Sequence, residues 1–104
     1  MQIQKVLKIS SLAVVSCLLI VYGFYWNEAR KEVFFLCGNF APGVTKADVI
    51  RQLDTANLSN YVVSNNDKGS SIIFSSKINF SFYQCSIEID KKGLVSNVGF
   101  SQLI

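Results

Sequence analysis

Residues 9–26 contain no charged side chain, and the centre of this run, residues 12–21, is almost wholly aliphatic. As an α-helix, roughly 18 residues at about 1.5 Å each cover about 27 Å, close to the bilayer's hydrocarbon thickness of about 30 Å. Aromatic residues end the run, and amphipathic rings favour the headgroup region. The sequence therefore predicts a transmembrane anchor over residues 9–26, with one membrane interface at Tyr22, Phe24, Tyr25 and Trp26.

Basic residues on either side of this run predict its orientation. Lys5, Lys8 and the amino terminus precede it, whereas Arg30 and Lys31 follow it beside two glutamates. Positive charges that flank a span tend to stay in the cytoplasm, and acidic residues count for little. We therefore expect residues 1–8 to be cytoplasmic and the chain after residue 26 to lie outside the inner (cytoplasmic) membrane.

Two other processing routes start from a similar sequence. A cleaved signal peptide also has a basic start and an apolar run, but small residues suited to cleavage do not follow the run here. Val-Val-Ser-Cys at residues 14–17 resembles a lipobox, in which Cys17 becomes the lipidated first residue. Because the chain stays apolar from Leu18 to Val21, we favour an uncleaved anchor, with a lipoprotein anchored at Cys17 as the alternative.

The segment after the anchor is polar at first and predicts a helical extension over residues 27–36. Glu28, Lys31 and Glu32 within it have the spacing of a solvated helix face. Helix-breaking residues then predict a hinge between anchor and domain, at Gly38, Pro42 and Gly43.

A second helix is predicted from Thr45, whose hydroxyl is suited to cap the first turn, with Asp48 as its acidic partner. Its apolar side chains recur with helical spacing, as expected of a core helix. These apolar residues are Ala47, Val49, Ile50 and Leu53.

The remainder of the chain has the alternation and the turn residues of β-strands. Residues 61–64 and 71–75 flank a turn and predict a hairpin. Residues 78–82 alternate, and after a phase change at Tyr83 the alternation resumes, which indicates a bulge or a break between strands. A glycine turn at residues 90–93 leads into a final strand.

The expected fold class is therefore α+β. A transmembrane helix precedes one short helix packed on an antiparallel sheet of about four strands. The small extracytoplasmic domain is expected to cover residues 37–104.

Cys37 and Cys85 are the two cysteines of this domain, one before the short helix and one in the sheet. Outside the cytoplasm such a pair usually forms a disulfide, here across about 48 residues. Two buried free thiols are the alternative. A metal site is not expected, because the chain has no histidine and its third cysteine lies in the anchor.

The sequence offers little for enzyme chemistry or for cofactors. There is no histidine to act as a base, and Glu88 and Asp90 have no third group beside them. The glycines form no phosphate-binding run, so neither a nucleotide nor another small-molecule substrate is inferred. A net charge of +3 with dispersed lysines does not indicate nucleic-acid binding. Asn57 and Asn79 each begin a glycosylation sequon, which matters only in a eukaryotic source.

Residues 42–53, Pro-Gly-Val-Thr-Lys-Ala-Asp-Val-Ile-Arg-Gln-Leu, followed by strands and the Ile-Asp-Lys-Lys-Gly-Leu-Val turn at residues 89–95, resemble small bacterial envelope domains of the SmpA/OmlA (BamE-like) type. The resemblance covers the pattern of residues 40–101. It implies a helical hairpin on a three-stranded sheet and a role in outer-membrane protein assembly through protein contacts. This chain departs from the pattern by lacking a clear second helix after Leu53 and by adding the cysteine pair.

Two functions are compatible with these features. The first is a non-enzymatic accessory domain of the bacterial cell envelope that binds the lipid bilayer through its anchor and another envelope protein through its sheet. The second is a membrane-anchored immunity protein that neutralises a toxin outside the cytoplasm. The candidate partner contacts are the aromatic residues of the predicted strands, Phe80, Phe82, Tyr83 and Phe100.

Overall fold

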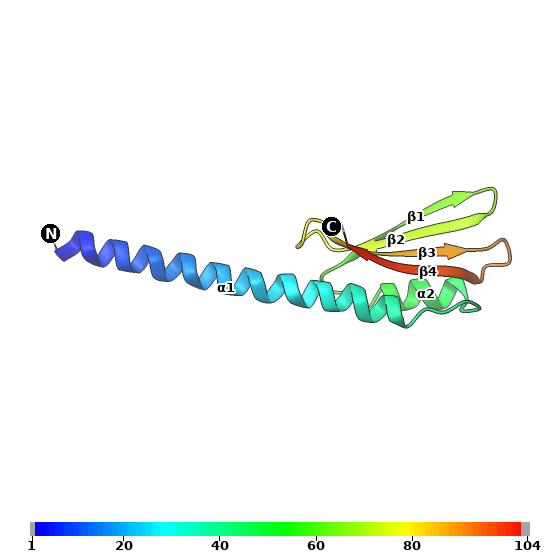
Figure 1. Cartoon of the computed structure of the whole chain (residues 1–104), viewed down its shortest axis with the longest axis horizontal. Helices are drawn as coiled ribbons and strands as arrows, with labels where there is room; N and C mark the ends of the chain where they lie inside the picture. Colours follow the sequence, from blue (N-terminus) through cyan, green and yellow to red (C-terminus); the bar gives the residue numbers. More distant parts are fainter. Residues whose placement is uncertain (1, 103–104) are drawn as a thin grey trace.

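The computed structural model describes residues 2–102, which form two α-helices followed by a four-stranded antiparallel sheet (Figure 1). The strands follow one another in the order β1-β2-β3-β4, so every neighbour is a chain neighbour. The α+β fold class is confirmed. The elements are α1 (Gln2–Gly38), α2 (Lys46–Leu53), β1 (Asn60–Asn66), β2 (Gly69–Ser75), β3 (Tyr83–Ile89) and β4 (Val95–Gln102).

Helix α1 is one unbroken helix of 37 residues that joins the apolar run to the domain. Its N-terminal part projects away from the sheet, and the molecule is 72 Å long but only about 20 Å across (Figure 1). Ala29, Val33 and Cys37, spaced four residues apart, are its buried side chains. The helix break expected after residue 37 is present, but it is not a hinge between anchor and domain, because Ala29 and Val33 already belong to the buried interior.

Helix α2 begins as predicted. Thr45 is its N-cap, and its side-chain oxygen accepts a hydrogen bond of 3.2 Å from the Asp48 backbone N–H. The Asp48 carboxylate pairs with Arg51 at 2.9 Å, inside the first turns. Asp54 is the C-cap of α2, and its carboxylate accepts a hydrogen bond from the Tyr61 hydroxyl. This hydrogen bond, together with burial and the negative charge of Asp54, raises the pKa of Tyr61 above its usual 10.0.

The first hairpin is confirmed and is tighter than predicted. Asn66 pairs with Gly69, so only Asp67 and Lys68 lie between β1 and β2. Gly69 has a φ of 138°, and a Cβ there would lie 2.0 Å from the Ile89 carbonyl oxygen. Glycine is required at this position both by its backbone conformation and by the approach of the neighbouring strand.

The prediction of strand alternation over residues 78–82 is wrong. These residues form a loop between β2 and β3 in which Phe80 and Ser81 both have positive φ angles, 54° and 58°. The phase change at Tyr83 is therefore a break between strands, because β3 begins at that residue. The sheet does contain an irregularity, but it lies between Glu88 and Ile89, where β3 pairs with β4.

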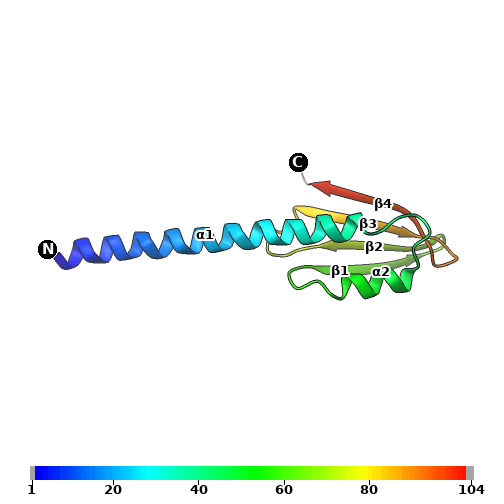
Figure 2. The ribbon, with the colours of Figure 1, turned by 90° about the horizontal axis from the view of Figure 1, so that it is seen from below.

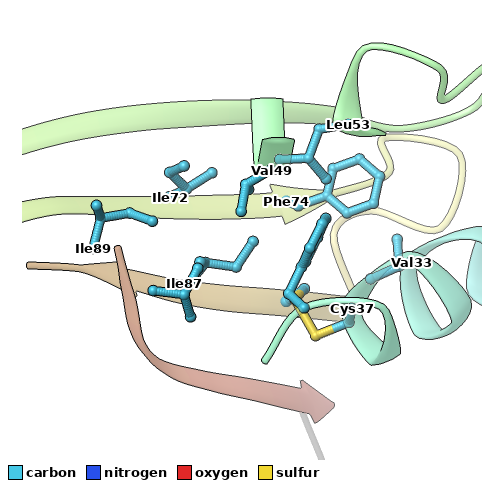
Figure 3. Packing of buried hydrophobic residues seen from close by; sticks show 11 residues of the cluster. Val33, Cys37, Val49, Leu53, Ile72, Phe74, Ile87 and Ile89 are labelled. Carbon is cyan, nitrogen blue, oxygen red and sulfur yellow. A yellow bond between two sulfur atoms is a disulfide. The ribbon is translucent and has the colours of Figure 1, made fainter. Parts of the chain in front are cut away.

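Both helices cover one face of the sheet (Figures 1 and 2). Alternate residues of β2 and β3 point between the layers, where α1 and α2 meet them (Figure 3). Burial of these apolar side chains is the main favourable contribution to stability. The main buried side chains are Val33, Val49, Leu53, Ile72, Phe74, Cys85, Ile87 and Ile89.

The predicted disulfide is present between Cys37 and Cys85, whose Cα atoms are 5.7 Å apart. It joins the last turn of α1 to the middle of β3, and Cys85 is fully buried. The bond therefore links helix and sheet inside the core (Figure 3).

Candidate functional site

The apolar part of α1 is not covered by the rest of the protein. An 18-residue window in this helix has a mean hydropathy of 2.1 and is 0% buried. By length and composition the helix can cross a membrane or act as a signal sequence. The large apolar side chains of this part of the helix are exposed, among them Leu12, Leu18 and Ile20.

The four aromatic residues expected at the membrane interface have different surroundings. Tyr22, Phe24 and Tyr25 are exposed on the helix, at 43%, 60% and 45% of their surface. Trp26 is half-buried, and its ring centroid lies 6.1 Å from that of Phe82 and 6.5 Å from that of Tyr83. The end of the apolar run is therefore in contact with the start of β3.

These contacts belong to a continuous aromatic cluster between α1 and the sheet, which we call the aromatic junction. Edge-on and stacked rings of this kind add stability beyond their buried area. The junction consists of Tyr22, Trp26, Phe34, Phe82, Tyr83 and Phe100, with centroid separations between neighbours of 4.8 to 6.5 Å.

Three candidate partner contacts therefore lie in the junction. Phe82, Tyr83 and Phe100 are half-buried against one another and against α1. Phe80 is different, because 77% of its surface is exposed. The sequence predicts separate sites for the helix aromatics and the strand aromatics, whereas the structure brings them together.

The loop between β2 and β3, residues 76–82, is attached to α1 by a hydrogen bond. The Tyr22 hydroxyl donates to the Ile78 carbonyl oxygen at 2.6 Å, across 56 residues of sequence. Beside this bond lies an open apolar surface, lined by Tyr22, Tyr25, Leu58, Lys77, Ile78 and Phe80. The loop thus adds its own apolar side chains to the surface of α1.

Glu32 has a structural role that the helix-face prediction missed. Its carboxylate accepts hydrogen bonds from the backbone N–H groups of Asn57, at 3.0 Å, and Leu58, at 3.1 Å. The segment between α2 and β1 is thereby attached to α1. Glu28 and Lys31 have the solvated pairing expected, with 3.7 Å between them and both side chains exposed.

A sequence signal for this packing does exist. Tyr22, Trp26, Ala29, Val33 and Cys37 recur at intervals of four, three, four and four residues, which places them on one side of a helix. Ala29, in the middle of this stripe, is fully buried. From the sequence, Tyr22 and Trp26 are assigned to the membrane interface, and they are therefore not included in a buried helix face.

The described residues contain few groups arranged for chemistry. No group of three or more His, Cys, Asp or Glu residues within 2–102 could hold a metal ion. Of the two sequon asparagines, Asn57 is exposed, whereas the Asn79 side chain is fully buried and its two polar atoms have no protein partner. In the folded protein only the first of these sequons is accessible.

Comparisons of the chain with protein-family models, curated proteins and solved structures gave no match. The resemblance to SmpA/OmlA domains stays a prediction. The fold and the site define an α+β protein with a long apolar N-terminal helix and one disulfide that joins the helix to the sheet.

The aromatic junction predicts an effect of truncating Trp26. Trp26→Ala is expected to destabilise the domain by roughly 2 kcal/mol, because the half-buried ring contacts both Phe82 and Tyr83. The measurement is hydrogen exchange of the β3 amides in the full chain in detergent micelles. Phe24→Ala, on the exposed side of the same helix, is the control and should leave exchange unchanged. Equal effects of the two changes would contradict the junction.

Glu32 supports a second prediction. Glu32→Ala leaves the N–H groups of Asn57 and Leu58 without their carboxylate, and is expected to cost about 1–3 kcal/mol. The amides of both residues should exchange faster with solvent. Glu28→Ala removes only an exposed ion pair and should cost less than about 0.5 kcal/mol. Unchanged exchange at residues 57 and 58 in Glu32→Ala would show that the carboxylate does not hold this segment.

Proposed function

We propose that this chain is a single-pass membrane protein of a cell envelope, with α1 crossing the inner membrane and the α+β domain on its non-cytoplasmic side. The observation that carries the proposal is that one continuous helix has an exposed apolar part followed by a part buried in the domain. Its apolar window is 0% buried, while Ala29, Val33 and Cys37 further along are core residues. A bilayer is the environment that suits the first part, and the domain itself stabilises the second.

The orientation is supported by two independent features. Lys5 and Lys8 precede the apolar run, and positive charge is retained in the cytoplasm. The Cys37–Cys85 disulfide lies at the other end of the helix, and such bonds form and persist in oxidising compartments. Both features support a location of the domain outside the cytoplasm.

Retention of the helix is supported by its contacts. Cleavage after the apolar run would remove the Tyr22 hydrogen bond to Ile78 and the Trp26 contacts with Phe82 and Tyr83. A lipoprotein beginning at Cys17 would keep these contacts, so it is separated from an uncleaved anchor by the intact mass of the purified protein. The mass expected is that of the full chain without lipid.

Topology is tested by labelling introduced cysteines in intact cells with a membrane-impermeant maleimide, in a Cys17→Ser background. Lys68→Cys, in the exposed turn between β1 and β2, should be labelled directly. Gln4→Cys should be labelled only after the membrane is permeabilised. The opposite labelling pattern would contradict the proposed orientation. Recovery of the intact chain in the aqueous fraction would contradict the proposed membrane anchor.

We further propose that the domain binds another envelope protein without catalysing a reaction on it. The sheet face away from the helices supports this role. Its two large apolar side chains, Val62 and Ile73, are paired across β1 and β2 and are 67% and 37% exposed. Around them the face carries mostly small and polar residues, including Ser64, Ser71 and Ser86, and one carboxylate, that of Glu88.

A photo-crosslinking amino acid at Val62 tests this binding in intact cells. A specific adduct is expected at Val62 and none at Lys91, which is exposed in the turn before β4. Identification of the adduct distinguishes the two functions: an envelope-assembly protein supports the accessory role, and a toxin supports the immunity role. No adduct above the Lys91 control would argue against a partner at this face.

A further inference from the structure

The β2–β3 loop, residues 76–82, lies beside the outer end of the apolar run of α1. Its attachment point is Tyr22, four residues before Trp26, and therefore about 6 Å closer to the membrane centre along the helix axis. The loop extends from the sheet toward the N-terminal part of α1, as the yellow segment of Figure 1 shows. If α1 spans the bilayer with residues 9–26, this loop reaches the level of the lipid headgroups.

Phe80 is the most exposed aromatic side chain of this loop, at 77% of its surface. It lines the same open apolar surface as Tyr22 and Tyr25. A phenylalanine with a positive φ and an exposed ring is unusual in water, because its backbone is strained and its side chain gains no burial. Insertion of the ring into lipid would remove its apolar surface from water.

Several backbone groups of the loop already have hydrogen-bond partners, which lowers the cost of entering a medium of low polarity. The N–H groups of Ile78, Phe80, Ser81 and Phe82 all donate within the loop, at 2.8 to 3.2 Å. The Ile78 carbonyl accepts from Tyr22. Unpaired groups would make entry into the bilayer interface costly, and these five groups are paired.

The charge at this site also suits a membrane surface. Lys77 is exposed and lines the apolar surface together with Phe80. An ammonium group on a long apolar stem can reach lipid phosphates while its stem stays near the acyl chains. The loop therefore offers one aromatic ring for the interface and one cation for the headgroups.

We propose that the β2–β3 loop is a second membrane contact, with Phe80 inserted into the leaflet that α1 leaves and Lys77 on the lipid phosphates. The occupant of the surface is thus the lipid of the same bilayer. The proposal rests on the membrane anchoring proposed above. With two contacts on the leaflet, the domain would be held against the membrane at a defined tilt.

The test uses the full chain in nanodiscs of phosphatidylethanolamine and phosphatidylglycerol, with a spin label at one cysteine. Three proteins are compared: the wild type labelled at its exposed Cys17, Cys17→Ser/Phe80→Cys, and Cys17→Ser/Lys68→Cys. The ratio of collisions with oxygen to collisions with a water-soluble nickel chelate reports the depth of each label. The labels at 17 and 80 should both show a ratio several-fold above that at 68, with 17 the deeper.

Each other outcome overturns a defined part of the proposal. A water-like label at 80 with a lipid-like label at 17 rejects the loop contact and leaves the anchor. A water-like label at 17 rejects both. Spin–spin broadening at 80, or shielding from oxygen and nickel together, would assign Phe80 to a protein contact and likewise reject the lipid contact.

A second measurement guards against disulfide exchange with the introduced cysteine. Phe80→Trp in a Trp26→Phe background places the only indole in the loop. Lipids brominated near the headgroup should quench its fluorescence more strongly than lipids brominated near the chain end. Lys68→Trp in the same background should be quenched by neither, and equal lack of quenching at 80 would reject the contact.

Discussion

Replacing both Cys37 and Cys85 with alanine is expected to lower the free energy of unfolding of the domain by about 4 kcal/mol. The disulfide closes a loop with a sequence separation of 48 residues, so its removal restores a large conformational freedom to the unfolded chain. A small domain has about 5–15 kcal/mol of stability in total. The change therefore removes a large share of it.

The double replacement avoids an unpaired thiol in the core at Cys85, which is fully buried. Unfolding is followed in denaturant by the fluorescence of Trp26, the only tryptophan and a member of the aromatic junction. Cys17→Ser is the control, because Cys17 is exposed on α1 and forms no bond. A loss below about 1 kcal/mol in the double variant would show that the fold does not depend on this link.

Phe74→Ala is expected to destabilise the domain by about 3–5 kcal/mol. Phe74 is the largest fully buried side chain, and it lies opposite Cys85 in the register of β2 and β3. It belongs to the same buried cluster as Val33 of α1 and Leu53 of α2 (Figure 3). The truncation leaves a cavity that close-packed neighbours cannot fill without strain.

Phe35→Ala provides a control of the same chemistry at an exposed site. With 63% of its surface exposed, Phe35 contributes little to the core, and its truncation should change the stability by less than about 0.5 kcal/mol. Denaturant titrations of both variants in detergent micelles compare them directly. Similar losses for Phe74→Ala and Phe35→Ala would mean that the core assigned to the domain is wrong.

The continuity of α1 has a consequence for how a bound partner would be presented to the membrane. Because α1 continues from the apolar run into the core, no flexible linker separates the two in the described residues. Glu32 and Tyr22 attach two further segments, at Asn57 and Ile78, to the same helix. The tilt of α1 in the bilayer would therefore set the direction in which the open sheet face points.

Local features of the sequence predicted most of the elements. The cap at Thr45, the hairpin before and after Asp67, and the turn at Gly93 depend on residues close together in the chain, and all three are present. The pairing of Cys37 with Cys85 was also predictable, because the domain contains only two cysteines. Capping and turn formation depend on a few neighbouring residues, and two cysteines can form only one disulfide.

An apolar N-terminal helix, the α+β order of elements and the disulfide were predictable from the chain, because periodicity, capping and cysteine number are properties of the sequence. Three features became visible only in the folded protein: Trp26 packs near Phe82, residues 78–82 lie outside the sheet, and the Glu32 carboxylate accepts hydrogen bonds from a distant backbone segment. Aromatic side chains are equally suited to a bilayer interface, a strand and a packed junction. Which of these three environments an aromatic side chain occupies depends on contacts between segments far apart in the chain, and a local sequence pattern does not reveal such contacts.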